Sequence, residues 1–121
     1  MRRKAKDTHI FVTTYKLLRR LHNLIVHFPR DEKHTYGQEM KYIIIHDLFR
    51  YIRLANDHID EREQALNDFM SEFSTLELLI KFCHDIGCIS DKDTAELSII
   101  QEDIIRQCNA WRDKAKSMRE S

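Results

Sequence analysis

Apolar residues recur at spacings of three and four positions in four stretches of the chain, and only short breaks separate the stretches. This period places one apolar stripe along each of four helices. With two glycines and one proline in 121 residues, the chain has little of the material from which tight turns are made. The sequence therefore predicts a single all-α domain over residues 1–121, with helices over about residues 8–28, 36–56, 62–86 and 91–117.

Local signals predict where these helices begin and end. Pro29 should end the first helix, because proline offers no backbone donor to a helix. Thr35 should cap the second helix, with Gln38 reaching back to complete a capping box. Gly87 should end the third helix and Ser90 should begin the fourth. Connections this short favour antiparallel neighbours, so the expected architecture is an up-down-up-down antiparallel four-helix bundle.

Each expected helix has one stripe that should face the core. In the first helix it is Ile10, Thr14, Leu17, Leu21, Leu24 and Phe28, and in the second it is Met40, Ile44, Leu48, Tyr51 and Ala55. The third stripe is Leu66, Phe69, Phe73, Leu76, Ile80 and Cys83, and the fourth is Leu97, Ile100, Ile104, Cys108, Trp111 and Ala115.

The second helix carries more apolar surface than one core requires. A neighbouring face presents Tyr42, Ile45, Phe49 and Ile52 at helical spacing. A helix that is apolar on most sides needs burial on most sides, and large exposed apolar patches are uncommon in monomers. These four residues are therefore predicted to form an interface between copies of the chain or with a partner. A broad core within one bundle is the alternative.

Charge is balanced overall, with 20 basic and 20 acidic side chains, but it is unevenly distributed along the chain. Residues 1–30 hold eight Lys or Arg and a single acid, and further basic residues gather near the C-terminus. Such a surface can follow phosphates, although a near-neutral protomer should bind nucleic acid weakly and in a salt-sensitive way. A merely solvated face is the alternative. The candidate nucleic-acid or partner residues are Arg2, Arg3, Lys4, Lys6, Lys16, Arg19, Arg20, Arg112, Lys116 and Arg119.

Sequence signals for catalysis are weak. The chain has no Glu-x-x-His pair of the kind that holds di-iron centres in helical bundles, and its three cysteines lack zinc-site spacing. Arg53 and His58 match the loose Arg-to-His spacing of some helical ribonucleases, but chance produces such matches readily. We expect a non-enzyme without cofactor or metal. Apolar runs are too short to span a membrane, and we expect a cytoplasmic protein.

Several short motifs resemble those of a known family. They are Phe28-Pro29-Arg30, Thr35-Tyr36-Gly37, the segment from His84 to Ser90, Ile104-Ile105-Arg106 and Asn109-Ala110-Trp111. With these motifs, most of residues 8–112 resembles the accessory variability determinant proteins of diversity-generating retroelements. Those proteins belong to a wider four-helix-bundle family that includes proteins encoded in 23S rRNA intervening sequences.

This resemblance implies a specific role. It implies a homopentameric barrel with a central channel that binds the reverse transcriptase and template RNA of the retroelement and supports mutagenic reverse transcription. Family members in that role are commonly strongly basic, which this chain is not. Two alternatives stay open at this point: an intervening-sequence-type protein of unknown role, and a helical ribonuclease.

Overall fold

The computed structural model describes residues 3–121, which form helices and turns without any strand. The all-α prediction is confirmed. The α-helices are α1 (His9–Ile25), α2 (Arg30–Glu32), α3 (Gln38–Tyr42), α4 (Phe49–Asp57), α5 (Arg62–Asp85) and α6 (Asp91–Glu120). Two π-helical segments, Lys33–Gly37 and Ile43–Leu48, join α2, α3 and α4 into one continuous rod. Single 3₁₀ turns at Ala5–Asp7 and Ile59–Glu61 precede α1 and α5.

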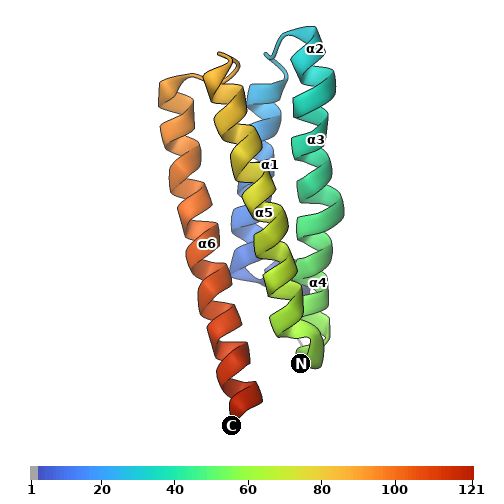
Figure 1. Ribbon diagram of the computed structural model, residues 1–121. Coiled ribbons are helices and arrows are strands. Elements are labelled where there is room, and N and C mark those ends of the chain that lie inside the picture. The colour runs from blue at the N-terminus through green and yellow to red at the C-terminus, as the bar shows by residue number, and fades with distance from the viewer. Residues whose placement is uncertain (1–2) are drawn as a thin grey trace.

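The described chain thus contains four helical rods, which lie side by side in Figure 1: α1, the α2–α4 rod, α5 and α6. The α6 rod packs against α1 and α5, α5 also packs against α4, and α1 packs against α3. Each rod therefore contacts two others, and the apolar core lies between them.

The first helix begins as predicted but ends early. Thr8 caps it, and its hydroxyl accepts a hydrogen bond from the backbone N–H of Phe11 at 3.3 Å. The helix ends at Ile25, three residues before the predicted end at Phe28. The backbone N–H groups of His27 and Phe28 bond three residues back instead of four, so the chain tightens before Pro29. Phe28 still reaches the core from this turn.

The predicted start of the second helix at Thr35 is wrong. Helical backbone begins at Arg30, directly after Pro29, whose extended conformation makes it the cap. Thr35 lies inside the rod, and its hydroxyl donates to the backbone carbonyl of Asp31 at 2.7 Å. No capping box with Gln38 forms. Proline stops the preceding helix, but nothing in the residues after it prevents an immediate restart.

The predicted signals that end the third helix and begin the fourth are confirmed. After α5, Gly87 has a φ of +88°, and its N–H donates to the carbonyl of His84 at 3.0 Å. The N–H of Cys88 donates to the carbonyl of Cys83 at 2.8 Å, which completes a Schellman motif. The Ser90 hydroxyl caps α6 by accepting a hydrogen bond from the N–H of Asp93 at 3.0 Å. The α6 helix ends at Glu120, three residues beyond the predicted end.

Most predicted core positions are buried, including all six of the third stripe. Four predicted core positions are only half-buried: Leu24, Tyr51, Trp111 and Ala115. Leu24 is half-buried and Ile25 takes its place in the core, while Tyr51 is half-buried and Ile52 takes its place. The hydrophobic residues that the α2–α4 rod buries are Met40, Ile43, Ile44, Leu48, Ile52 and Ala55.

The π-helical segment Ile43–Leu48 explains why Ile52, and not Tyr51, lies in the core. Met40, Ile44, Leu48 and Ile52 repeat every four positions, and an α-helix of 3.6 residues per turn would rotate such a repeat away from the core. Ile43–Leu48 forms the wider π-helical turn, which takes up the excess. Ile52 therefore stays aligned with Met40, although a regular helical period favours Tyr51.

Gly37 lies where the first two rods approach each other closely. It is buried in the π-helical segment Lys33–Gly37, and a Cβ atom added there would lie 2.6 Å from the Cγ2 methyl of Ile25. Ile25 is itself buried and β-branched, so its methyl has little freedom to move away. Only glycine fits this contact without a shift.

We predict that Gly37→Ala destabilises the protein by about 1–2 kcal/mol, because overpacking outweighs the roughly 1 kcal/mol that alanine gains in helix propensity. Urea unfolding followed by circular dichroism measures the effect. Gln38→Ala, at the exposed neighbouring position, is the matched control and should change stability little. If Gly37→Ala is as stable as this control, the close approach of the two rods is not a constraint.

The turn between α5 and α6 contains a cluster of ion pairs around His84. The Nε2 atom of His84 lies 2.5 Å from Oδ1 of Asp91, and its Nδ1 atom lies 3.4 Å from Oδ1 of Asp85. The hydrogen bond with Asp91 is the main reason that the pKa of His84 is raised above its ordinary value. The protonated imidazole therefore links the first turn of α6 to the end of α5.

We predict that Asp91→Asn lowers the pKa of His84, measured by NMR titration of the imidazole protons. Because the pKa of His84 is raised in the folded state, its ion pairs stabilise the fold fully below the unfolded pKa of about 6.5. This stabilisation is lost as the pH rises through the folded pKa. The stability difference between wild type and Asp91→Asn should therefore shrink on going from acidic to alkaline pH. An unchanged His84 pKa would contradict the contact.

Candidate partner and nucleic-acid surfaces

The predicted interface residues of the second rod fall into two groups. Tyr42 is 53% exposed and Ile45 is 48% exposed, so both present apolar surface to the outside of the protomer. Phe49 is half-buried, with its ring centre 4.9 Å from that of Phe11 on α1. Ile52 is fully buried in the protomer's own core and cannot contact another chain. We therefore remove Ile52 from the predicted interface and call Tyr42, Ile45 and Phe49 the apolar face.

A groove of about 420 Å³ lies beside the apolar face, between α1 and the second rod. Ile45 of the apolar face and the predicted basic residue Arg19 both line this groove. The sequence analysis assigned these two residues to separate surfaces. Tyr15, about half exposed, lies in the same groove and stacks near Phe11. We call this feature the α1–α3 groove; its lining residues are Tyr15, Leu18, Arg19, His22, Asn23, Lys41 and Ile45.

Lys41 and His22 were not among the residues predicted from the sequence. Lys41 adds a second cation to the groove, across from Arg19 on a different rod. No local pattern marks either residue, because each gains its place only through the packing of α1 against α3. A groove lined by both apolar and cationic side chains suits a protein partner that brings acidic side chains, or a phosphate backbone.

Nine of the ten predicted basic residues lie in the described part of the chain, and Arg2 lies outside it. Within residues 3–121, Arg20 and Arg119 are the two of these nine that form ion pairs, while Arg3 lies over the ring of Trp111 and Arg112 donates hydrogen bonds to asparagines. The other five form no ion pair there, and all five are exposed: Lys4, Lys6, Lys16, Arg19 and Lys116. Lys16 and Arg19 project from α1, and the other three lie toward the chain ends. These side chains remain available to an anionic partner.

The other arginines are engaged within the protein. One Nη2 atom of Arg20 lies 2.7 Å from Asp93 and 2.7 Å from Glu96, which ties α1 to the first turns of α6. Arg119 forms a two-pronged pair with Glu63, at 2.6 and 3.3 Å, and this hydrogen bonding lowers the pKa of the Glu63 carboxyl. Arg112 donates to the side-chain oxygens of Asn67 and Asn109.

Potential catalytic groups are limited in the described residues. Burial raises the pKa of both Cys83 and Cys108 to about 11, so these thiols are poor nucleophiles near neutral pH. Within residues 3–121, no three or more His, Cys, Asp or Glu side chains gather in a way that could hold a metal ion. Arg53 and His58 line one small hollow of about 190 Å³. None of the helices described has the length and apolarity needed to cross a membrane.

Comparison with known proteins identifies one family. The model of the family described as bAvd-like matches residues 9–115, which run from the first residue of α1 to near the end of α6. Comparison with curated proteins and with solved structures gives no match. The matched range contains the α1–α3 groove and the whole apolar face.

Arg19 and Arg20 are neighbours on α1, but of the two only Arg20 forms ion pairs within the described chain. They therefore allow a matched test of the structural role of Arg20. We predict that Arg20→Glu destabilises the protein by about 1–2 kcal/mol, because it removes two partly exposed ion pairs and adds a third carboxylate beside Asp93 and Glu96. Arg19→Glu should shift stability by less than about 0.5 kcal/mol. Thermal unfolding at low and high salt measures both, and equal melting temperatures would contradict a structural role for Arg20.

Proposed function

The chain belongs to the bAvd-like family, and from this membership we propose that it is a non-catalytic accessory protein of a diversity-generating retroelement. In this role it binds the reverse transcriptase and the template RNA and supports mutagenic reverse transcription. The family match over residues 9–115 is the observation that carries the proposal, because it covers all four rods. The sequence motifs that resemble accessory variability determinants lie almost entirely in the same range.

We further propose that the four rods run alternately up and down, as an antiparallel bundle, and that five copies form a barrel with a central channel. The apolar face supports self-association, because Tyr42 and Ile45 are each about half exposed and adjoin the half-buried Phe49. Surfaces of this kind are usually covered by a partner. The number five rests on the family resemblance alone.

Contact with the polymerase and RNA is proposed for the exposed cations. Lys16 and Arg19 on α1 are free of internal ion pairs in the described chain, and Lys41 extends the positive charge across the α1–α3 groove. Arg20 and Arg119 are left out of this surface, because carboxylates already hold them. With a net charge of zero, one protomer should bind RNA weakly, and the array of copies in a ring would strengthen that binding. We place this activity in the cytoplasm.

Solution mass tests the assembly and the surface separately. Wild type should scatter light as a pentamer and gain mass when the cognate reverse transcriptase is added. Tyr42→Lys combined with Ile45→Lys should yield protomers, because two charges would enter the apolar face. Lys16→Glu with Arg19→Glu should leave the pentamer intact but weaken the complex with the polymerase or RNA at least tenfold.

Ile99→Lys is the matched control for the apolar face, since Ile99 is exposed on α6 and lies outside that face. It should leave the mass unchanged. A wild-type protein that is monomeric and gains no mass when the polymerase is added would overturn the proposal. RNA cleavage by the purified protein that disappears in His58→Ala would support the ribonuclease alternative instead.

A further inference from the structure

A second exposed apolar surface lies on α5, apart from the apolar face of the second rod. Leu78 is 68% exposed, Phe82 41% and Ile86 44%, and these residues recur every four positions toward the end of the helix. They therefore share one side of α5 and its C-cap. We call Leu78, Phe82 and Ile86 the α5 face. Exposed apolar clusters of this kind usually mark a contact site.

The α5 face and the apolar face lie on different flanks of the second rod. The ring centre of Phe82 lies 4.9 Å from that of Tyr36, so the α5 face adjoins the second rod from the α5 side. The apolar face lies toward α1, because Phe49 contacts Phe11 and Ile45 lines the α1–α3 groove. In Figure 1 the second rod accordingly has α1 on one flank and α5 on the other. One protomer thus presents two separate apolar faces.

The helices beside these two faces differ in charge. The α1 helix has three Lys or Arg residues and no acidic residue, and two of the three, Lys16 and Arg19, form no ion pair within residues 3–121. Lys41 adds a further cation next to Tyr42 of the apolar face. On α5, residues 63–80 hold four acidic residues and no Lys or Arg. The apolar face therefore has cationic surroundings, and the α5 face follows an acidic stretch.

Two of the four acidic residues lie in line with the α5 face. Asp68 and Glu72 belong to the helical stripe that continues to Phe82, because positions 68, 72, 75, 79 and 82 are three or four residues apart. Both are partly exposed, and neither forms an ion pair within residues 3–121. The other two acidic residues, Glu63 and Glu77, bond to side chains of α6. The carboxylates of Asp68 and Glu72 can therefore meet cations from another chain.

Charge favours contact between unlike faces of two copies. Two apolar faces packed together would bring Lys41 and the α1 cations of both copies close to each other, and two α5 faces would do the same with Asp68 and Glu72. An apolar face packed on an α5 face sets cations opposite carboxylates instead. Complementary charge selects which surfaces meet, while the apolar side chains at the centre exclude water. The α5 face is therefore suited to the apolar face of a second copy.

We propose that the apolar face of one copy packs on the α5 face of the next. This contact rests on the proposed function, which requires self-association, and it names the second surface that a ring of copies needs. Because the two surfaces differ, each added copy leaves one face of each kind unoccupied until the ends of the row meet. The two faces flank a single rod, so each copy is turned relative to the one before it, as the closure of a ring requires.

Two variants of the full chain test this contact when they are mixed. The first carries Tyr42→Lys with Ile45→Lys on the apolar face, and the second carries Leu78→Lys with Ile86→Lys on the α5 face. By light scattering each variant alone should have the mass of one protomer, because each has lost one half of the contact. An equal mixture should form dimers and nothing larger, since one intact face of each kind remains and the two lysine-bearing faces repel each other.

Ile99→Lys is again the matched control, because it places a lysine on an exposed isoleucine of α6 outside both faces, and it should keep the wild-type mass. Leu78→Lys alone, at the most exposed position of the α5 face, should also lose the assembly and guards against misfolding of the double variant. Circular dichroism should show that each variant is folded. A folded α5-face variant with the wild-type mass, a mixture of folded variants that stays monomeric, or a monomeric wild type would overturn the proposed contact.

Adding the reverse transcriptase separates this contact from the proposed function. A wild type that gains mass with the polymerase, together with an α5-face variant that still assembles, would overturn the contact and leave the function standing. Dimers in the mixture, together with a wild-type assembly that gains no mass with the polymerase, would support the contact and contradict the function.

Discussion

The second helical rod must keep a repeat of four facing one core, and this requirement shapes much of the molecule. Four residues of an α-helix overshoot one full turn by about 40°, so the stripe would drift onto the surface within a few turns. The π-helical segment Ile43–Leu48 absorbs that drift and keeps Ile52 in the core. The same alignment leaves Tyr42 and Ile45 exposed on one side of the rod. The geometry of the backbone thus creates both the core and the face that is proposed to join protomers.

Charge in this protein has two distinct uses. Arg20, Arg119 and their carboxylate partners fasten rods together, and Asp93 lies 73 positions from Arg20 along the chain. Lys16 and Arg19 form no such pairs in the described chain and remain at the surface. A neutral total charge therefore conceals a local excess of cations on α1. For an accessory protein of the bAvd-like family, this arrangement would make binding of an acidic partner depend on assembly and on salt.

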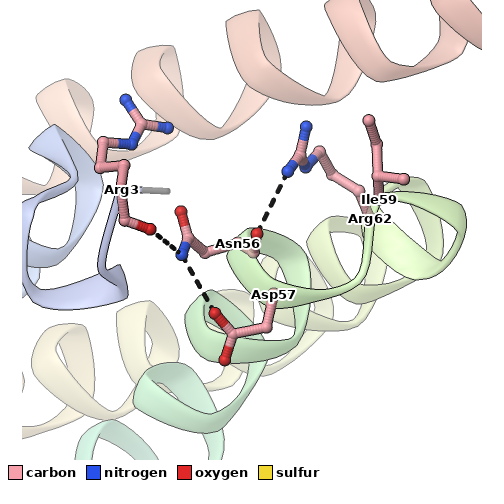
Figure 2. A pocket seen from close by; sticks show the side chains of 5 residues that line it. All are labelled: Arg3, Asn56, Asp57, Ile59 and Arg62. Atoms are coloured by element: carbon pink, nitrogen blue, oxygen red, sulfur yellow. Dashed lines mark hydrogen bonds between the residues drawn. The ribbon is translucent and has the colours of Figure 1, made fainter. Parts of the chain in front are cut away.

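Two hollows lie at different places on the rods. The α1–α3 groove is open and combines apolar with cationic side chains, which suits a large partner. The hollow around Arg3, Asn56 and Arg62 is larger, at about 580 Å³, and hydrogen bonds to backbone carbonyls hold the side chains of Asn56 and Arg62 there (Figure 2). Arg3 and Arg62, which line the second, also lie within 5.8 and 5.2 Å of the ring centre of Trp111. The chemistry of the two hollows differs enough for variants to affect one without the other.

The sequence by itself determined the features that depend on near neighbours. Helical periods, the Ser90 cap, the Gly87 turn and the whole stripe of α5 follow from residues a few positions apart, and all were predicted. Tertiary structure decided the rest. The burial of Ile52 and the pairing of Arg20 with α6 depend on contacts between rods. The contacts of Arg3 and Arg62 with the ring of Trp111 bring together side chains from three distant parts of the chain, and no local spacing encodes such a meeting.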